Sequence, residues 1–262
     1  MAGVGAISAS ETSALAGALA AIGQAPEQPE ATPPAGWSPQ QVADRLLDTL
    51  LAGDGPIYIA VTGTGGASYD HAVLSTLQEV ARQGSGGAAT VVSLPYANGV
   101  ADIGRRTLGL SGSGRDEALA IVLRELARRA PHRPVYVVAQ SQGSWLVSQV
   151  LRDDPDAARA VTRAVLFSRP ALAPSVDAWV AAGTLLEVNH VDDIVTGVPT
   201  ALNREMLRSF AASTMDWMRG QRFSYLPHRY EPDAALAARF LLGSSLGLAE
   251  AARHHSGMHH RH

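Results

Sequence analysis

This chain of 262 residues contains no cysteine. Disulfide bonds are therefore impossible, and a cysteine nucleophile or a cysteine-ligated zinc site is excluded. No apolar run reaches the length of about 20 residues that a membrane-spanning helix needs. The formal net charge of −3 offers no excess of positive charge for nucleic acid or an anionic membrane. What remains is an ordinary globular protein, as the apolar content of 46% indicates.

Segments outside the main domain are predicted at both ends of the chain. Residues 1–36 combine one short helical pattern with four prolines between positions 26 and 34, so we expect an appendage of a helix and a linker, or a disordered tail. The main domain is predicted over residues 37–250, followed by a histidine-rich tail at 251–262 that we exclude from the mechanism. The first residues lack the basic group of a conventional signal peptide. Together with the missing cysteines this favours the cytoplasm, and secretion is the alternative.

Short β-branched runs alternate with amphipathic patterns through the main domain. Strands are predicted at 57–61, 90–94, 135–138, 164–167 and 184–188. Helices are predicted at 39–51, 69–82, 116–130, 144–151 and 233–241, with a short helix from Pro155. This alternation predicts an α/β fold with a central, mostly parallel sheet flanked by helices. The first strand is apolar throughout, which places it in the centre of that sheet.

One stretch joins such a strand to such a helix through Gln140, Ser141, Gln142 and Gly143. A sharp strand-to-helix turn around x-Ser-x-Gly is a nucleophile elbow, in which the serine takes a strained backbone conformation beside small residues. Ala139 stands where the usual motif has its first glycine. The helix directs backbone N–H groups at the space above Ser141, where an oxyanion would develop. Ser141 is therefore the candidate nucleophile, and the alternative is a serine in an ordinary loop.

A glycine-rich loop at residues 62–66 follows the first strand. It lacks the lysine of a phosphate-binding P-loop and the spacing of a dinucleotide-binding motif, so nucleotide binding is disfavoured. In a serine hydrolase, a loop at this place supplies the second N–H of the oxyanion hole. Gly63 and Thr64 are the candidate donors, beside the N–H of Gln142.

A serine hydroxyl needs a neutral histidine to take its proton and a carboxylate behind that histidine. In α/β hydrolases the acid and then the histidine follow the serine along the chain. Asp193, just past the strand at 184–188, is the candidate acid and Asp192 the alternative; both are also candidates for plain turn residues. His228, in a loop before the last helix, is the candidate base. His190 precedes the acid and is expected to be a supporting or surface group.

Three segments, in this order, resemble the cutinase family of serine esterases within the α/β-hydrolase superfamily. Gln140-Ser-Gln-Gly143 is similar to the family's Tyr-Ser-Gln-Gly elbow, and Asp193-Ile-Val-Thr196 to its Asp-Leu-Val-Cys segment. Residues 227–234 resemble its Pro-His-x-x-Tyr-x-x-Asp-Ala segment. The resemblance covers residues 57–242 and implies a cutinase-like α/β-hydrolase fold.

The resemblance also implies a role for each candidate. Ser141 is implied to be the nucleophile, Asp193 the acid and His228 the base. The N–H of Gln142 is implied to be one oxyanion donor, with a second donor from the loop after the first strand. This assignment agrees with the one that the motifs themselves indicate.

The chain departs from the family around the acid. The paired cysteines of the family are replaced by Asn189 and Thr196, so the loop that carries Asp193 must be held by hydrogen bonds and packing alone. This difference, with Ala139 in the elbow, argues against secretion and against cutin-like polymers as substrates.

A long insert separates the acid from the base. Residues 199–220 have a helical pattern rich in Met and aromatic residues, which predicts either a cap over the serine or an extra helix packed on the core. A cap would make Met206, Phe210 and Trp217 an apolar wall of the substrate site. Such a wall fits a small-molecule ester or thioester with a medium-sized apolar acyl group.

Three functions follow from these features. The first is a serine hydrolase that cleaves a carboxylic ester or thioester through an acyl-enzyme on Ser141. The second keeps the acyl-enzyme but changes the acceptor, as in an acyltransferase or a cyclising thioesterase of a biosynthetic pathway. The third is a non-catalytic binding protein on the same scaffold. The three residue types of a triad occur in the expected order, which favours the enzymes, and no metal or cofactor is expected.

Overall fold

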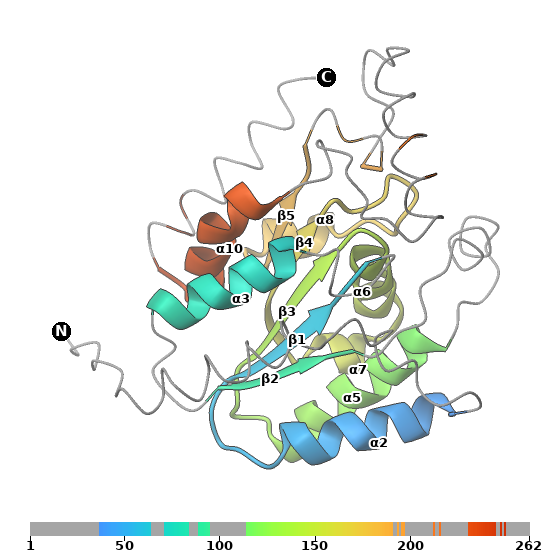
Figure 1. Cartoon of the computed structure of the whole chain (residues 1–262). Coiled ribbons are helices and arrows are strands. Elements are labelled where there is room, and N and C mark those ends of the chain that lie inside the picture. Colours follow the sequence, from blue (N-terminus) through green and yellow to red (C-terminus); the bar gives the residue numbers. More distant parts are fainter. Residues whose placement is uncertain are drawn as a thin grey trace.

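Five parallel strands form one sheet in the described part of the chain, in the order β2-β1-β3-β4-β5 (Figure 1). The strands are β1 (Ile57–Val61), β2 (Thr90–Ser93), β3 (Val135–Gln140), β4 (Val161–Phe167) and β5 (Leu185–Val188). The computed structural model describes residues 37–63, 71–83, 89–94, 114–190, 193, 195–196, 212, 215, 230–244, 247 and 249. All five predicted strands are present, and their parallel pairing confirms the predicted fold class.

Helices cover both faces of this sheet (Figure 1). One face carries α2 (Pro39–Leu50), α5 (Arg115–Arg129), α6 (Gln142–Asp153), α7 (Pro155–Ala158) and the short α8 (Asp177–Ala181). The other face carries α3 (His71–Gln83) and α10 (Ala234–Leu241), which the 3₁₀ turn η2 (Glu231–Asp233) precedes. The core therefore consists of two apolar layers with the sheet between them.

Local sequence explains where these elements begin. Ser38 caps α2: its hydroxyl accepts a hydrogen bond from the N–H of Gln41, the Gln41 side chain accepts one from Ser38, and Pro39 opens the helix. Asp154 caps α7 in the same way, through the N–H of Ala157. Every residue of β1 is buried, because the strand lies between β2 and β3 with helices on both sides.

The structure also differs from the predicted boundaries. β3 continues to Gln140 and α6 already begins at Gln142, so the turn between them is shorter than predicted. β4 begins at Val161 instead of Ala164. The helix α8 was not predicted, because a helix of five residues is too short for an apolar period to show.

Two predicted segments lie outside the described residues: the appendage at 1–36 and the tail at 251–262. In the predicted cap at 199–220 only Ala212 and Met215 are described, and both are helical. Among the described residues, no helix has the length and apolar character needed to span a bilayer.

Candidate active site

Ser141 is the only residue between β3 and α6. Its backbone has φ 54° and ψ −121°, a conformation that residues with a side chain rarely adopt. The turn is fixed because the N–H of Ser141 continues the sheet, donating to the carbonyl oxygen of Phe167 at 2.9 Å. A serine before a helix usually caps it, yet within the described structure the Ser141 side chain makes no such hydrogen bond. The strand-to-helix turn thus presents a hydroxyl that the helix itself does not use.

Gly143 permits this turn because α6 starts in contact with β1. A Cβ at position 143 would lie 2.2 Å from the carbonyl oxygen of Val61 and 2.7 Å from that of Thr62. Both are backbone atoms, which cannot rotate away. Ala139 is fully buried on the other side of the turn. The motif therefore needs its glycine after the serine and tolerates alanine before it.

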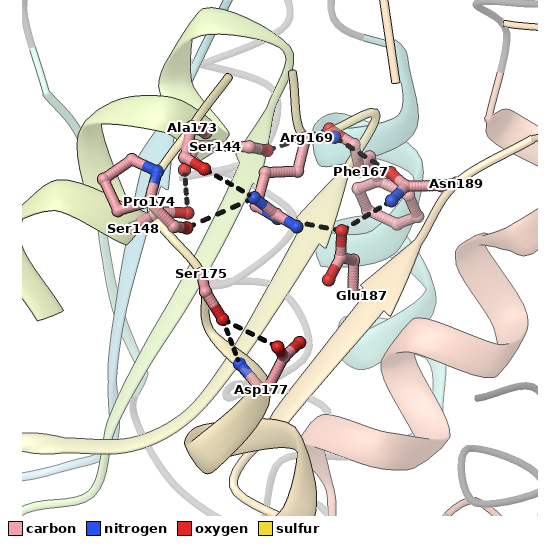
Figure 2. Close-up of polar contacts among 10 residues, drawn as sticks. All are labelled: Ser144, Ser148, Phe167, Arg169, Ala173, Pro174, Ser175, Asp177, Glu187 and Asn189. Atoms are coloured by element: carbon pink, nitrogen blue, oxygen red, sulfur yellow. Dashed lines mark hydrogen bonds and ion pairs between the residues drawn. The ribbon is translucent and has the colours of Figure 1, made fainter. Parts of the chain in front are cut away.

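Two further serines lie on the buried face of α6, and one of them bonds the helix to β4 (Figure 2). The hydroxyl of Ser144 donates to the carbonyl oxygen of Phe167 at 2.8 Å, and the hydroxyl of Ser148 donates to that of Ser144 at 2.8 Å. Both side chains are buried. Sequence reasoning missed them, although two serines four residues apart on a buried helix face were a visible signal.

Two of the predicted oxyanion donors, Gln142 and Gly63, lie at neighbouring strand ends. Gln142 is the first residue of α6 and is buried, and Gly63 follows β1, which pairs with β3. The first N–H groups of a helix point outward along its axis and carry partial positive charge. Backbone N–H groups of both segments therefore lie at the edge of the sheet where Ser141 lies.

Asp193 lies beyond β5 at the same carboxyl edge of the sheet and is 1% exposed. Its Oδ2 accepts hydrogen bonds from the hydroxyls of Ser168, at 2.6 Å, and Tyr230, at 2.9 Å. Its Oδ1 accepts one from the N–H of Val195 at 3.0 Å. A buried carboxylate is costly unless donors surround it, and here three do. The bond from Val195 is a contact within the turn, so Oδ1 of Asp193 stabilises its own loop while Oδ2 binds Ser168 at the end of β4.

Thr196 closes the loop that carries Asp193. Its hydroxyl lies 3.1 Å from the carbonyl oxygen of His190 and 2.9 Å from that of Asp193. The backbone repeats this pattern, since Asp193 donates to His190 and Thr196 to Asp193, each at 3.1 Å. The prediction that hydrogen bonds hold this loop is confirmed at Thr196.

Asn189 takes part in a second group of contacts, around Arg169 (Figure 2). The Arg169 guanidinium donates to Glu187 at 2.8 Å and to the carbonyl oxygens of Ala173 and Pro174 at 3.0 and 3.2 Å. Asn189 accepts from the N–H of Arg169 at 2.9 Å and donates to Glu187 at 2.5 Å. This partly buried ion pair ties the segment after β4 to β5 at the base of the acid loop.

Tyr230 is completely buried and joins the acid loop to the start of the last helix. Its hydroxyl accepts from the N–H of His190 at 3.0 Å and donates to Asp193. The ring stacks on His190 at 4.0 Å between centroids and tilts against Phe167 at 5.9 Å. Nε2 of His190 lies 2.9 Å from Oδ2 of Asp233. Burial, and then the negative charge of Asp193, raises the pKa of Tyr230 well above its usual range, so the hydroxyl stays protonated.

Four predicted site residues are described, and all lie at the carboxyl edge of the sheet: Ser141, Gln142, Gly63 and Asp193. The other predicted site residues lie outside the described residues: Thr64, Asp192, Met206, Phe210, Trp217 and His228. Within the described part of the chain, no group of three His, Asp or Glu side chains is placed to hold a metal ion.

A parallel sheet with a one-residue elbow after its middle strand and a buried acid beyond β5 is the framework of an α/β hydrolase. The sequence model of a family described as "Alpha/beta hydrolase of unknown function (DUF900)" matches residues 41–193. The match covers more than half of the chain, and the chain belongs to this family. The predicted α/β-hydrolase fold is thereby confirmed.

Three solved structures illustrate what this chain is similar to. A cutinase from Trichoderma reesei, in complex with a phosphonate inhibitor, is 17% identical, with 78% of this chain and 89% of that chain covered and a TM-score of 0.49. An acetyl xylan esterase is 13% identical, covering 73% and 100%, with a TM-score of 0.46. A cutinase-like protein from Cryptococcus sp. is 16% identical, covering 75% and 99%, with a TM-score of 0.45. No curated protein sequence matches.

Proposed function

We propose that this protein is a serine hydrolase that cleaves a carboxylic ester or thioester through an acyl-enzyme on Ser141. The backbone of Ser141 is the observation that carries the proposal. A non-glycine residue at φ 54° costs about 1–3 kcal/mol, and such strain persists where the surrounding structure holds it for a purpose. Here the strained turn holds a hydroxyl in front of the N-terminus of α6, at the edge where a buried carboxylate also lies.

His228 is the proposed base, and chain connectivity supports it. Two residues of extended chain span at most about 7 Å, and His228 precedes Tyr230 by two residues. Since the Tyr230 hydroxyl is hydrogen-bonded to Asp193, the chain two residues after His228 lies beside the proposed acid. β3 and β5 lie two strand spacings apart, about 10 Å, which leaves room for one imidazole between Ser141 and Asp193.

The proposed reaction has two halves. His228 takes the proton of Ser141 as its Oγ attacks the carbonyl carbon, and the carbonyl electron pair moves to oxygen. N–H groups of Gln142 and of Gly63 or Thr64 stabilise that oxyanion, which collapses and expels the alcohol or thiol with the proton from His228. Water, deprotonated by His228, then attacks the acyl group, releases the carboxylic acid and restores the serine. The anionic carboxylate behind the imidazole stabilises its protonated form.

The substrate is proposed to be a small molecule with a medium-sized apolar acyl group. This rests on Met206, Phe210 and Trp217, which are proposed as an apolar wall beside the serine. Their helical spacing also fits a helix packed on the core, so truncation of each to alanine tests the assignment. Loss of preference among acyl lengths, without loss of activity on the shortest ester, is the expected result.

A panel of esters and thioesters of varied acyl length tests the function. Ser141→Ala is expected to lower kcat/KM by about three or more orders of magnitude. Ser175→Ala, on an exposed turn, is the matched control and should retain activity. Full activity of Ser141→Ala contradicts the proposal. No hydrolysis of any substrate by the wild-type protein, together with no labelling of Ser141 by a fluorophosphonate, favours the binding protein.

Two further measurements assign the base and the acceptor. His228→Ala is expected to lose activity, whereas His254→Ala and His255→Ala in the tail should keep it. Products formed with water alone are compared with those formed when an alcohol or amine is added. Predominant transfer of the acyl group to the added nucleophile would favour the acyltransferase alternative.

A further inference from the structure

Two hydroxyl groups converge on one oxygen of Asp193. Ser168 follows β4 and has φ 49°; apart from Ser141, it is the one non-glycine residue with positive φ in the described part of the chain. Its N–H donates to the carbonyl oxygen of Val188 at 2.9 Å, which fixes this conformation at the sheet edge. In it, the Ser168 hydroxyl reaches Oδ2 of Asp193 at 2.6 Å. Ser168, the second non-glycine residue with positive φ in the described chain, thus also directs its side chain to the candidate site.

The second hydroxyl belongs to Tyr230, and it is held from every side. The phenol oxygen accepts the N–H of His190 while it donates to Asp193. The ring lies between the ring of His190 and that of Phe167. A hydrogen bond that a phenol accepts strengthens the one it donates, because each polarises the other. A rigid ring with few rotamers therefore delivers a strong donor to a fixed point.

We propose that Tyr230 and Ser168 are positioning residues that hold the carboxylate of Asp193 in the orientation that the base requires. The inference rests on the proposed function. Tyr230 adds a link that Ser168 does not supply. It lies two residues from His228, so one side chain sets the acid and the end of the base-bearing segment relative to each other. Neither hydroxyl is assigned a contact with substrate.

The electrostatics of the pair agree with this role. Oδ2 of Asp193 needs donors, and a deprotonated phenol would instead repel the carboxylate. The raised pKa of Tyr230 keeps its proton on the oxygen throughout the range in which an imidazole base operates. A serine hydroxyl does not ionise in that range. Both donors thus remain donors at every pH at which the enzyme would work.

Single-atom deletions test each residue. Tyr230→Phe removes the hydroxyl and keeps the stacked ring, and Ser168→Ala removes the other donor. Each variant is expected to lower kcat by about 10- to 100-fold with KM within about twofold of wild type, because neither touches substrate. The rate of fluorophosphonate labelling of Ser141 should fall by the same factor. Tyr58→Phe, at an equally buried tyrosine on β1, is the control and should keep wild-type kcat.

A double-mutant cycle separates positioning from a general structural role. Once Asp193→Asn has removed the carboxylate, adding Tyr230→Phe or Ser168→Ala is expected to change the labelling rate by less than about twofold. If Tyr230→Phe or Ser168→Ala lowers the labelling rate as much in Asp193→Asn as in wild type, the inference is overturned for that residue. A single variant with wild-type kcat overturns it in the same way. Full activity of Ser141→Ala would instead overturn the proposed function itself. If Tyr230→Phe fails to fold, as judged by circular dichroism, Ser168→Ala carries the same test alone.

Discussion

Replacing Gly143 by alanine adds one methyl group at the most crowded point of the elbow. The added carbon would lie 2.2 Å from the Val61 oxygen and 2.7 Å from the Thr62 oxygen, whereas contacts below 3.0 Å force a shift. Since both oxygens belong to the backbone, either α6 or the end of β1 must move by about 1 Å to restore an ordinary contact. We expect the variant to lose both stability and activity.

The two losses can be estimated separately. Overpacking costs about 1–3 kcal/mol, and a helical alanine returns at most about 1 kcal/mol over glycine, less in the first turn. Because no side chain can give way, the overpacking cost should lie near the upper end, about 3 kcal/mol, and subtracting at most about 1 kcal/mol leaves a net destabilisation of about 2 kcal/mol. A displacement of about 1 Å of Ser141 and the Gln142 N–H from the reacting carbonyl should lower kcat by about 100-fold.

Urea denaturation and ester hydrolysis measure these effects side by side. Gly183→Ala is the matched control: Gly183 has φ 69°, and no described atom lies within 4 Å of its added Cβ. That variant should lose about 1 kcal/mol from the left-handed backbone alone and keep full kcat. A Gly143→Ala protein with wild-type stability and wild-type kcat would refute the reasoning that this close approach holds the elbow.

Three other perturbations follow from described contacts. Glu187→Gln leaves the partly buried Arg169 cation without its charge partner and should cost about 2–3 kcal/mol in urea denaturation. Thr76→Val removes a buried hydroxyl that has no hydrogen-bond partner in the described structure, so the unfolding free energy should rise by about 1 kcal/mol. Burial raises the pKa of Tyr58, and burial with the charge of Asp193 raises that of Tyr230, so the folded state keeps protons that the unfolded chain loses above about pH 10. Stability should therefore fall as pH rises past 10, by up to about 1.4 kcal/mol per pH unit for each tyrosine.

Each of these has an outcome that contradicts it. Glu125→Gln breaks an exposed ion pair with Arg128 and should cost far less than Glu187→Gln; equal losses would mean that the buried network adds nothing. A destabilised Thr76→Val protein would show that its hydroxyl is satisfied. If Tyr58→Phe leaves the fall of stability with pH above 10 unchanged, Tyr58 does not contribute to it.

The fold was largely predictable because its signals are local. The apolar run of β1, the cap at Ser38 and the helical period of α5 can each be recognised from the residues of that one element. Strand and helix ends were less predictable: β3 extends to Gln140 because pairing with β4 carries it there, and pairing partners are not written in a local pattern. The five-residue α8 was missed for a different reason, since a helix of that length is too short for an apolar period to show.

The site divides in the same way. Ser141 was predicted from the elbow motif, and Asp193 from its position after a strand and after the serine in the chain. Ser168 was not, since its part depends on a positive φ at the end of β4 that no residue type reveals. Arg169 was missed because its partners come from two segments that only the folded sheet brings together. Long-range polar contacts of this kind leave no periodic trace in a sequence.

The length of the elbow has a consequence for how this scaffold can vary. One extra residue in the first turn of α6 would rotate the rest of the helix by about 100° relative to the elbow and shift it by about 1.5 Å along its axis. The face of α6 that carries Ser144 and Ser148 would then turn away from the strands, and Gly143 would leave the one place where a missing side chain is required. Insertions are therefore expected in segments that do not set the orientation of α6 relative to the strands. Changes of substrate range would then come from those segments, while the elbow stays as it is.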